Sequence, residues 1–303
     1  MMQVTKARDC RARSAIIGFT LDIEPASNST DEVNFINTMA QYSSLLAGTG
    51  LLLSADAGTA WTGVPVWNVT VDGTNKVLSE WLVDLCNETI IMDYDRNATN
   101  LLVRAAPYLD YADTLVSQGN NKSVTVGVAI SAPGDTPTWW QTESIKELES
   151  LIATVSPTLM SHASFGGRYA IFTGSTLMNN SATAPCPACA YAEQKTLWYV
   201  DDAWVYNVSV QSAFFDFACQ QHVVQLYDAP HAGNRPHIGA NPADEALYRS
   251  FVESADTRGI DVQFFSGVSD FTYDMAFIKS VNTSLPRNTT CHWDHRTDSA
   301  SGN

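Results

Sequence analysis

The sequence predicts an α/β fold in which eight parallel strands and the helices between them close a (β/α)8, TIM-like barrel. Short apolar runs alternate along the chain with amphipathic stretches, which is the pattern of a parallel sheet covered by helices. Eight such runs lie roughly 25 to 45 residues apart, the spacing that a barrel of ordinary size requires. The chain of 303 residues is also long enough to bury a large core.

The predicted strands are the short apolar runs, and they occupy 15–24, 50–57, 89–95, 123–132, 168–174, 196–200, 222–228 and 260–267. Helices are predicted where apolar residues recur at helical spacing, as Ile145, Leu148 and Ile152 do. The predicted helices cover 31–47 and 144–155, together with the apolar stripes within 210–217 and 247–252.

The composition argues against two classes of partner. Charged residues make up 16% of the chain, and its net charge is −15. Because such a field repels phosphate, neither nucleic acid nor an anionic membrane surface is an expected partner. No apolar run is long enough to cross a membrane, so membrane insertion is not expected. A neutral oligosaccharide or polysaccharide fits this charge balance, and the oligomeric state stays open.

Glycosylation sequons are more frequent than the composition explains. Asn-X-Ser/Thr occurs at nine of the eighteen asparagines, where chance would give about three. These asparagines are Asn28, Asn68, Asn87, Asn97, Asn121, Asn179, Asn207, Asn282 and Asn288. The excess predicts N-glycosylation, and therefore a protein that is secreted or lies in the lumen of the secretory pathway. The basic first residues lack the apolar core of a signal peptide, so either the chain begins inside a longer protein, which we favour, or the prediction of secretion is wrong.

Polar side chains end the first predicted strand, where Thr20, Asp22 and Glu24 alternate and Pro25 follows. Side chains two apart on a strand point to the same side, so these three are expected to face the barrel mouth, where active sites of such barrels lie. Two carboxylates on one face repel, which raises the pKa of one of them and suits a general acid beside an ionised partner. A structural acidic pair bonded to neighbouring loops is the alternative.

The third predicted strand ends in a similar run, Asp93, Tyr94 and Asp95. The two carboxylates share one face of an ideal strand, and Tyr94 lies on the other. Because the chain curls at a strand end, Tyr94 is still able to reach the mouth.

Together these two runs resemble motifs of the family 18 chitinases. Residues 18–24, GFTLDIE, look like the Gly-X-Asp-X-Asp-X-Glu of strand 4 in that family, and 92–95, MDYD, look like the Met-X-Tyr-Asp of strand 6. The resemblance implies that Glu24 protonates the glycosidic oxygen of a β-linked glycan. It implies that Asp22 orients a 2-acetamido group, which attacks the anomeric carbon in place of an enzyme nucleophile. Tyr94 would hydrogen-bond that acetamido group, and Asp95 would line the sugar site.

The same resemblance sets the expected order of the strands. If the first run is strand 4, residues 1–178 hold strands 4–8 and residues 196–285 hold strands 1–3. The segment 179–195, rich in small residues, Pro and Cys, is then a linker, and 286–303 is a disordered tail. The two parts are expected to close one circularly permuted barrel, and a slice of a tandem protein with two half-barrels is the alternative.

Further side chains at strand ends are candidate sugar contacts: Asp56, Asp93, Asp228, Trp61, Trp139, Trp140 and Tyr227. Aromatic rings at a barrel mouth stack on the apolar faces of sugars, although such rings can also cap a core. Neither a metal nor a cofactor is predicted.

Two departures from the family pattern keep other functions open. Thr20 stands where the family has its first Asp, and 169–173 lacks the Trp expected at the sugar floor. A catalytically inactive, glycan-binding barrel like the chitinase-like lectins is therefore the alternative to a glycosidase. An unrelated barrel hydrolase, such as a metal-dependent one using Asp22, Asp93 and Asp228, is the third.

Overall fold

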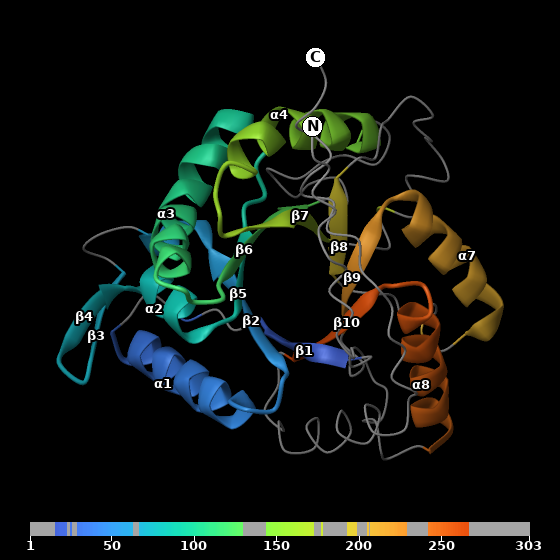
Figure 1. The fold of residues 1–303 in the computed structure, drawn as a ribbon, viewed down its shortest axis with the longest axis horizontal. Coiled ribbons are helices and arrows are strands. Elements are labelled where there is room, and N and C mark those ends of the chain that lie inside the picture. Colours follow the sequence, from blue (N-terminus) through green and yellow to red (C-terminus); the bar gives the residue numbers. More distant parts are fainter. Residues whose placement is uncertain are drawn as a thin grey trace, which may run out of the picture.

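The structure is a computed structural model, and it describes residues 16–22, 25, 29–62, 67–129, 144–172, 177, 193–198, 205, 207–228 and 242–266. All eight predicted strands are present, and they form one closed parallel barrel (Figure 1). The strands are β1 (Ile16–Leu21), β2 (Leu52–Gly58), β5 (Glu88–Met92), β6 (Ser123–Ala129), β7 (Phe165–Phe172), β8 (Gln194–Trp198), β9 (Val223–Asp228) and β10 (Asp261–Ser266). They follow one another around the ring in chain order, and β10 pairs with β1 to complete it. The predicted TIM-like barrel is confirmed.

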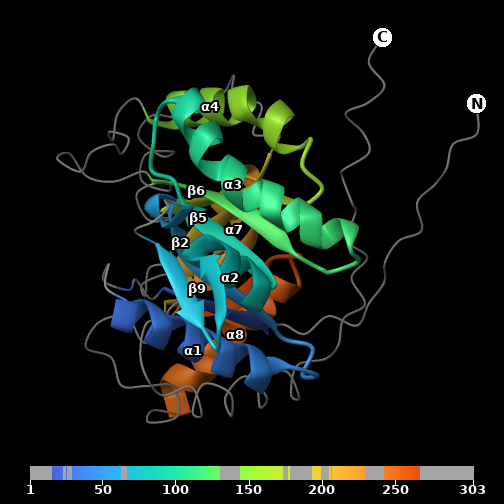
Figure 2. The same ribbon diagram turned by 90° about the vertical axis from the view of Figure 1, so that its left-hand side faces the viewer.

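Helices surround the barrel on its outer side (Figures 1 and 2). They are α1 (Ser29–Leu46), α2 (Leu78–Leu85), α3 (Ala98–Ser117), α4 (Ser144–Leu159), α7 (Val208–Gln220) and α8 (Pro242–Asp256). The four predicted helices correspond to α1, α4, α7 and α8, whereas α2 and α3 were not predicted. Asn97 caps the start of α3, because its side chain accepts hydrogen bonds from the Thr99 and Asn100 amides.

A small hairpin, β3 (Asn68–Val71) and β4 (Thr74–Val77), follows β2 and is a separate two-stranded sheet. Its turn is Asp72-Gly73, and both residues have positive φ, 48° and 78°. Such a two-residue turn matches the twist of antiparallel strands, and Asp-Gly is one of the sequences that adopt it most readily. The hairpin lies outside the barrel, beside α1 and α2 (Figure 1).

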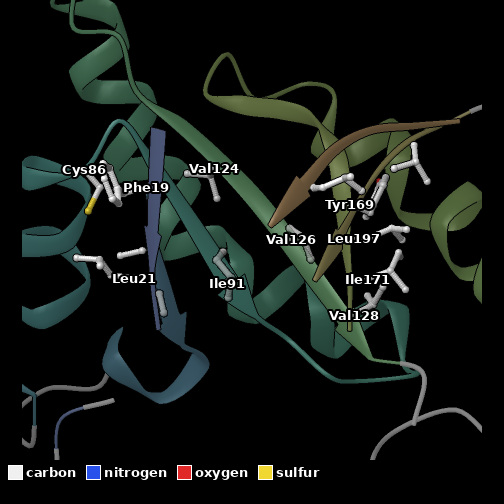
Figure 3. Packing of buried hydrophobic residues seen from close by; sticks show 14 of the residues in the cluster. Phe19, Leu21, Cys86, Ile91, Val124, Val126, Val128, Tyr169, Ile171 and Leu197 are labelled. Carbon is white, nitrogen blue, oxygen red and sulfur yellow. The ribbon is translucent and has the colours of Figure 1, made fainter. Parts of the chain in front are cut away.

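The main hydrophobic core lies between the barrel strands and the helices. Phe19 and Leu21 on β1, and Val124, Val126 and Val128 on β6, are all buried there (Figure 3). Because successive strand residues point to opposite sides, the residues that alternate with these point into the barrel. The outward-facing side chains therefore form the hydrophobic core with the helices, whereas the inward-facing side chains line the barrel interior.

The expected domain division is tested only in part. Residues 179–192 of the predicted linker lie outside the described residues. Gln194 and Lys195, at its other end, belong to β8 and pair with β7, so the linker prediction was wrong there. The predicted tail, 286–303, also lies outside them. A permuted barrel has the same neighbour order as an unpermuted one, so the permutation stays a prediction. None of the described helices combines the length and apolarity of a membrane span.

Candidate functional site

The lower part of the barrel interior, toward the N-terminal ends of the strands, is polar. Thr20 Oγ1 donates a hydrogen bond to Gln263 Oε1 over 2.7 Å, and Gln263 Nε2 donates one to Glu88 Oε2 over 3.3 Å. Ser54 Oγ lies 2.9 Å from Gln263 Oε1 and 3.1 Å from Glu88 Oε2. Thr125 donates to the other oxygen of Glu88. Side chains from β1, β2, β5, β6 and β10 thus form one hydrogen-bonded layer across the barrel.

An ion pair lies in this layer, between Glu88 on β5 and Arg168 on β7. Arg168 Nη2 is 2.7 Å from Glu88 Oε1, and the side chains are 21% and 2% exposed respectively. Burial alone would raise the pKa of Glu88, but the Arg168 guanidinium and the hydrogen bonds from Thr125 and Ser54 outweigh it and lower that pKa. Glu88 is therefore held as a carboxylate inside the barrel.

An aromatic cluster lies above this layer, toward the C-terminal ends of the strands: Tyr94, Phe172, Trp198 and Tyr227. The rings of Tyr94 and Phe172 stack with centroids 5.8 Å apart, and Trp198 meets Tyr227 at 5.9 Å. Trp198 also contacts the other two rings edge-on. Its indole reaches across to β6, where a Cβ on Gly127 would lie 2.8 Å from it, so only glycine leaves room there.

Two carboxylates lie at the same end of the barrel, on the adjacent strands β1 and β2. Thr20 is in register with Ser54, and Leu21 with Ala55, and Asp22 and Asp56 are the next residues along the two chains. Asp56 points inward by the alternation that sends Ser54 inward. Asp56 is 3% exposed, and Asp22 is partly exposed just after β1 ends. Asp22, Asp56, Tyr94 and Tyr227 are thus the predicted site residues that the described structure brings to one end of the barrel.

Asp93 and Asp95 lie on the other side of the β5 chain end from Tyr94, as the alternation predicts. Arg104 of α3 contacts both, with Nη1 3.2 Å from Asp93 Oδ1 and Nη2 3.0 Å from Asp95 Oδ2. Burial raises the pKa of Asp93 to about 6, although Arg104 opposes that rise. Burial also acts on Asp95, but hydrogen bonds from the Asn97 amide and Asn100, with the charge of Arg104, lower its pKa. This arrangement fastens the loop after β5 to α3.

We expect Asp93→Asn to stabilise the protein at neutral pH by about 1–3 kcal/mol. Because the pKa of Asp93 is raised in the folded protein, its contribution to stability is complete below about pH 4 and is lost as the pH rises through about 6. Asparagine carries no charge, so the variant does not lose this stability as the pH rises, and its side chain keeps the contact with Arg104. Urea unfolding between pH 4 and 8 measures the effect, which should be near zero at pH 4 and largest above pH 7.

Asp95→Asn is the matched control for that change, on the same loop and against the same Arg104. Its pKa is lowered in the folded protein, so its contribution is present above about pH 4 and is lost as the pH falls. Asp95→Asn should therefore destabilise the protein at neutral pH. If the free energies of unfolding of the two variants changed with pH in the same direction relative to wild type, the pKa values of Asp93 and Asp95 would not be shifted in opposite directions.

The remaining predicted contacts lie elsewhere or outside the described residues. Trp61 is buried against Phe35 of α1 and Trp67, so its ring contributes to the core. Asp228 ends β9, buried and on the opposite side of the strand from Tyr227. Glu24, Trp139 and Trp140 are not among the described residues.

Sequence reasoning missed four interior residues: Phe172, Trp198, Glu88 and Arg168. Alternation along β8 was the available signal for Trp198, because it lies two residues after Thr196 on a predicted strand. Trp198 belongs to β8, the strand after 169–173, and its ring contacts Phe172 in the interior.

The described segments contain no group of three His, Cys, Asp or Glu side chains placed to hold a metal ion. They place Asp22 and Asp56, on adjacent strands, at the same end of the barrel as the cluster of four aromatic rings. Aromatic rings can stack on the apolar faces of ring-shaped ligands, and carboxyl groups can donate or accept a proton. No family model matches the chain, and no curated protein matches it either.

Proposed function

We propose that the protein is a glycoside hydrolase that cleaves a β-linked glycan at the C-terminal end of its barrel. The observation that carries the proposal is the placement of Asp22 and Asp56 on adjacent strands, at the same end of the barrel as the Tyr94–Phe172–Trp198–Tyr227 cluster. Carboxyl groups are the acids and bases of glycoside hydrolysis, and aromatic rings bind the apolar faces of sugars. The similarity of 18–24 and 92–95 to the family 18 motifs supports the same chemistry.

In this proposal Glu24, two residues after Asp22, is the general acid. It gives its proton to the glycosidic oxygen while the acetamido oxygen of the substrate bonds to the anomeric carbon and the glycosidic bond breaks, so that the leaving sugar departs as an alcohol. Water then opens the cyclic intermediate. Asp22 orients the acetamido group of an N-acetylated substrate, and Tyr94 hydrogen-bonds that group. The rings of Phe172 and Trp198, which contact Tyr94, hold it toward the barrel interior.

Glu24→Gln tests the proposal with chitotetraose, whose sugar leaving group needs a proton to depart. We expect the wild type to release chitobiose and Glu24→Gln to lose about 10²- to 10⁴-fold in kcat, because the side-chain amide is not an acid. The KM should change little, since the amide has nearly the same shape. Glu245→Gln, on the partly exposed surface of α8, is the control and should retain wild-type activity.

The second candidate is a glycan-binding barrel without activity. It is favoured by Thr20, whose hydroxyl is engaged by Gln263 and supplies no acid beside Asp22. Binding of chitooligosaccharide by the wild type without turnover would select this candidate. Absence of both binding and turnover would reject the two proposals together.

We also propose that the chain is a secreted glycoprotein. Of its sequon asparagines, Asn68, Asn97, Asn121 and Asn207 are exposed in the described residues, as glycan attachment requires. Asn97 and Asn207 cap helices through Oδ1, which leaves Nδ2, the atom that carries a glycan, outside those bonds. Peptide mapping after enzymatic deglycosylation of the secreted chain tests this proposal.

A further inference from the structure

We propose that the lower interior of the barrel binds ordered water between β7, β8 and β9. The side chains that hold it are Arg168, Thr196 and Gln225, which lie on these three strands in that order. This inference goes beyond the proposed function, because it requires neither a glycan nor the residues that would cleave one.

The three side chains face the interior from neighbouring strands. Gln225 alternates along β9 with Leu226, which packs in the outer core, so its own side chain points inward. Thr196 on β8 alternates in the same way with Leu197. Thr196 is in register with Gln225, which makes the two direct neighbours on adjacent strands. Arg168 enters the same interior from β7, on the other side of β8 (Figure 1).

Polar atoms of these side chains are buried and make no hydrogen bond with any described residue. Thr196 is 0% exposed and Gln225 is 1% exposed, yet the Thr196 hydroxyl and both polar atoms of the Gln225 amide lack such a bond. The same is true of Arg168 Nε, although Nη2 of that guanidinium bonds Glu88. Buried polar groups are normally satisfied by protein or by ordered water, because an unpaired one costs free energy.

The Glu88 carboxylate, at the centre of the polar layer, has no capacity left for these groups. The side chains that already bond to it are Ser54, Thr125, Arg168, Tyr227 and Gln263. A carboxylate has about four lone-pair positions, so a further donor from Thr196 or Gln225 finds no free acceptor there. A partner from outside the protein is therefore expected on the β8 and β9 side of the interior.

The charges around this place favour water over an ion. Arg168 disfavours a cation, whereas Glu88 and Asp261, whose charges both act on Arg168, disfavour an anion. The Gln225 amide offers both a donor and an acceptor, and the Thr196 hydroxyl can act as either, which suits water. A buried water makes about three hydrogen bonds, and the three side chains can supply them. Water here joins Thr196 of β8 to the hydrogen-bonded layer around Glu88.

Thr196→Val tests the inference through the sign of its effect on stability. Valine has nearly the same shape as threonine but no hydroxyl. If water binds the hydroxyl, the substitution removes hydrogen bonds, and the equilibrium constant for folding should fall by about 2- to 10-fold. If the hydroxyl is unpaired, its removal relieves the cost of burying it, and the constant should rise. Urea unfolding at pH 7 measures the change. Thr114→Val, at an exposed hydroxyl of α3, is the control and should change the constant by less than about twofold.

Oxygen-17 magnetic relaxation dispersion of the full chain counts its long-lived water molecules directly. Thr196→Val and Gln225→Leu, made singly, should each hold fewer of them than the wild type, whereas Thr114→Val should hold the same number. Either interior variant is sufficient should the other not fold. A rise in the folding constant of Thr196→Val, or an unchanged water count in the interior variants, overturns the inference.

Discussion

Arg168→Met should lower the free energy of unfolding at neutral pH by about 3 kcal/mol, the lower end of the range for breaking a buried ion pair. The substitution leaves Glu88 charged, 2% exposed and without its cation inside the barrel. The Arg168 side chain is itself 21% exposed, so some water can reach the site, and this keeps the loss at the low end. Urea unfolding at pH 7 measures it.

The pH dependence of this loss identifies Glu88 as its cause. In the wild type the pKa of Glu88 is lowered, so its contribution to stability is present above about pH 4.5 and is lost as the pH falls. The difference between wild type and Arg168→Met should therefore shrink below pH 4. Arg249→Met removes a surface pair, Arg249 with Glu245 one helical turn away, and should cost at most about 0.5 kcal/mol. Equal losses in the free energy of unfolding would show that the interior ion pair stabilises the protein no more than the surface pair does.

Trp198→Ala is expected to have the largest effect on stability, a loss of about 3–5 kcal/mol. Trp198 is among the largest fully buried side chains, and it contacts Tyr94, Phe172 and Tyr227. Its removal leaves a cavity at the centre of the barrel that the surrounding strands cannot close, because they are held in a ring. Thermal and urea unfolding measure the loss.

Trp198→Phe separates packing from hydrogen bonding at the same position. The smaller ring keeps much of the aromatic contact, so the stability loss should be well below that of Trp198→Ala. It also removes the indole N–H, which has no hydrogen-bond partner in the described structure. If that group binds a glycan, Trp198→Phe should raise the Kd for chitooligosaccharide under conditions where the protein is still fully folded. Unchanged binding would exclude such a role for the indole.

The barrel could be predicted because its signal is local. Each strand is a short apolar run, and the rise and fall of hydropathy is visible without knowledge of any distant contact. Helix α3 was not predicted although it is the longest of the described helices, because Pro107 lies within it and interrupts the usual pattern of a helix. The β3–β4 hairpin was not predicted because its strands are short and mostly exposed, although its Asp72-Gly73 turn is a recognisable hairpin signal.

The site was harder to predict because its contacts connect distant parts of the chain. Glu88 and Arg168 are 80 positions apart, and nothing local to either indicates the other. The roles of Asp93 and Asp95 depend on the rotation of α3, which decides that Arg104 faces them. By contrast, alternation alone accounts for the inward direction of Thr20 and Ser54. Sequence could thus say which side chains face the interior, but not which of them meet there.

The hydrogen bond between Thr20 and Gln263 joins the first and last strands of the ring across 243 positions of sequence. At a synthesis rate of about 5–20 residues per second, roughly 12 to 50 s therefore pass between the synthesis of β1 and that of β10, the strand that pairs with its free edge. Throughout that interval one side of β1 presents free backbone amides and carbonyls to any other extended chain. Co-translational folding of this protein must therefore pass through an open, incomplete sheet, and its yield should depend on chaperones that shield that edge until the ribosome releases β10.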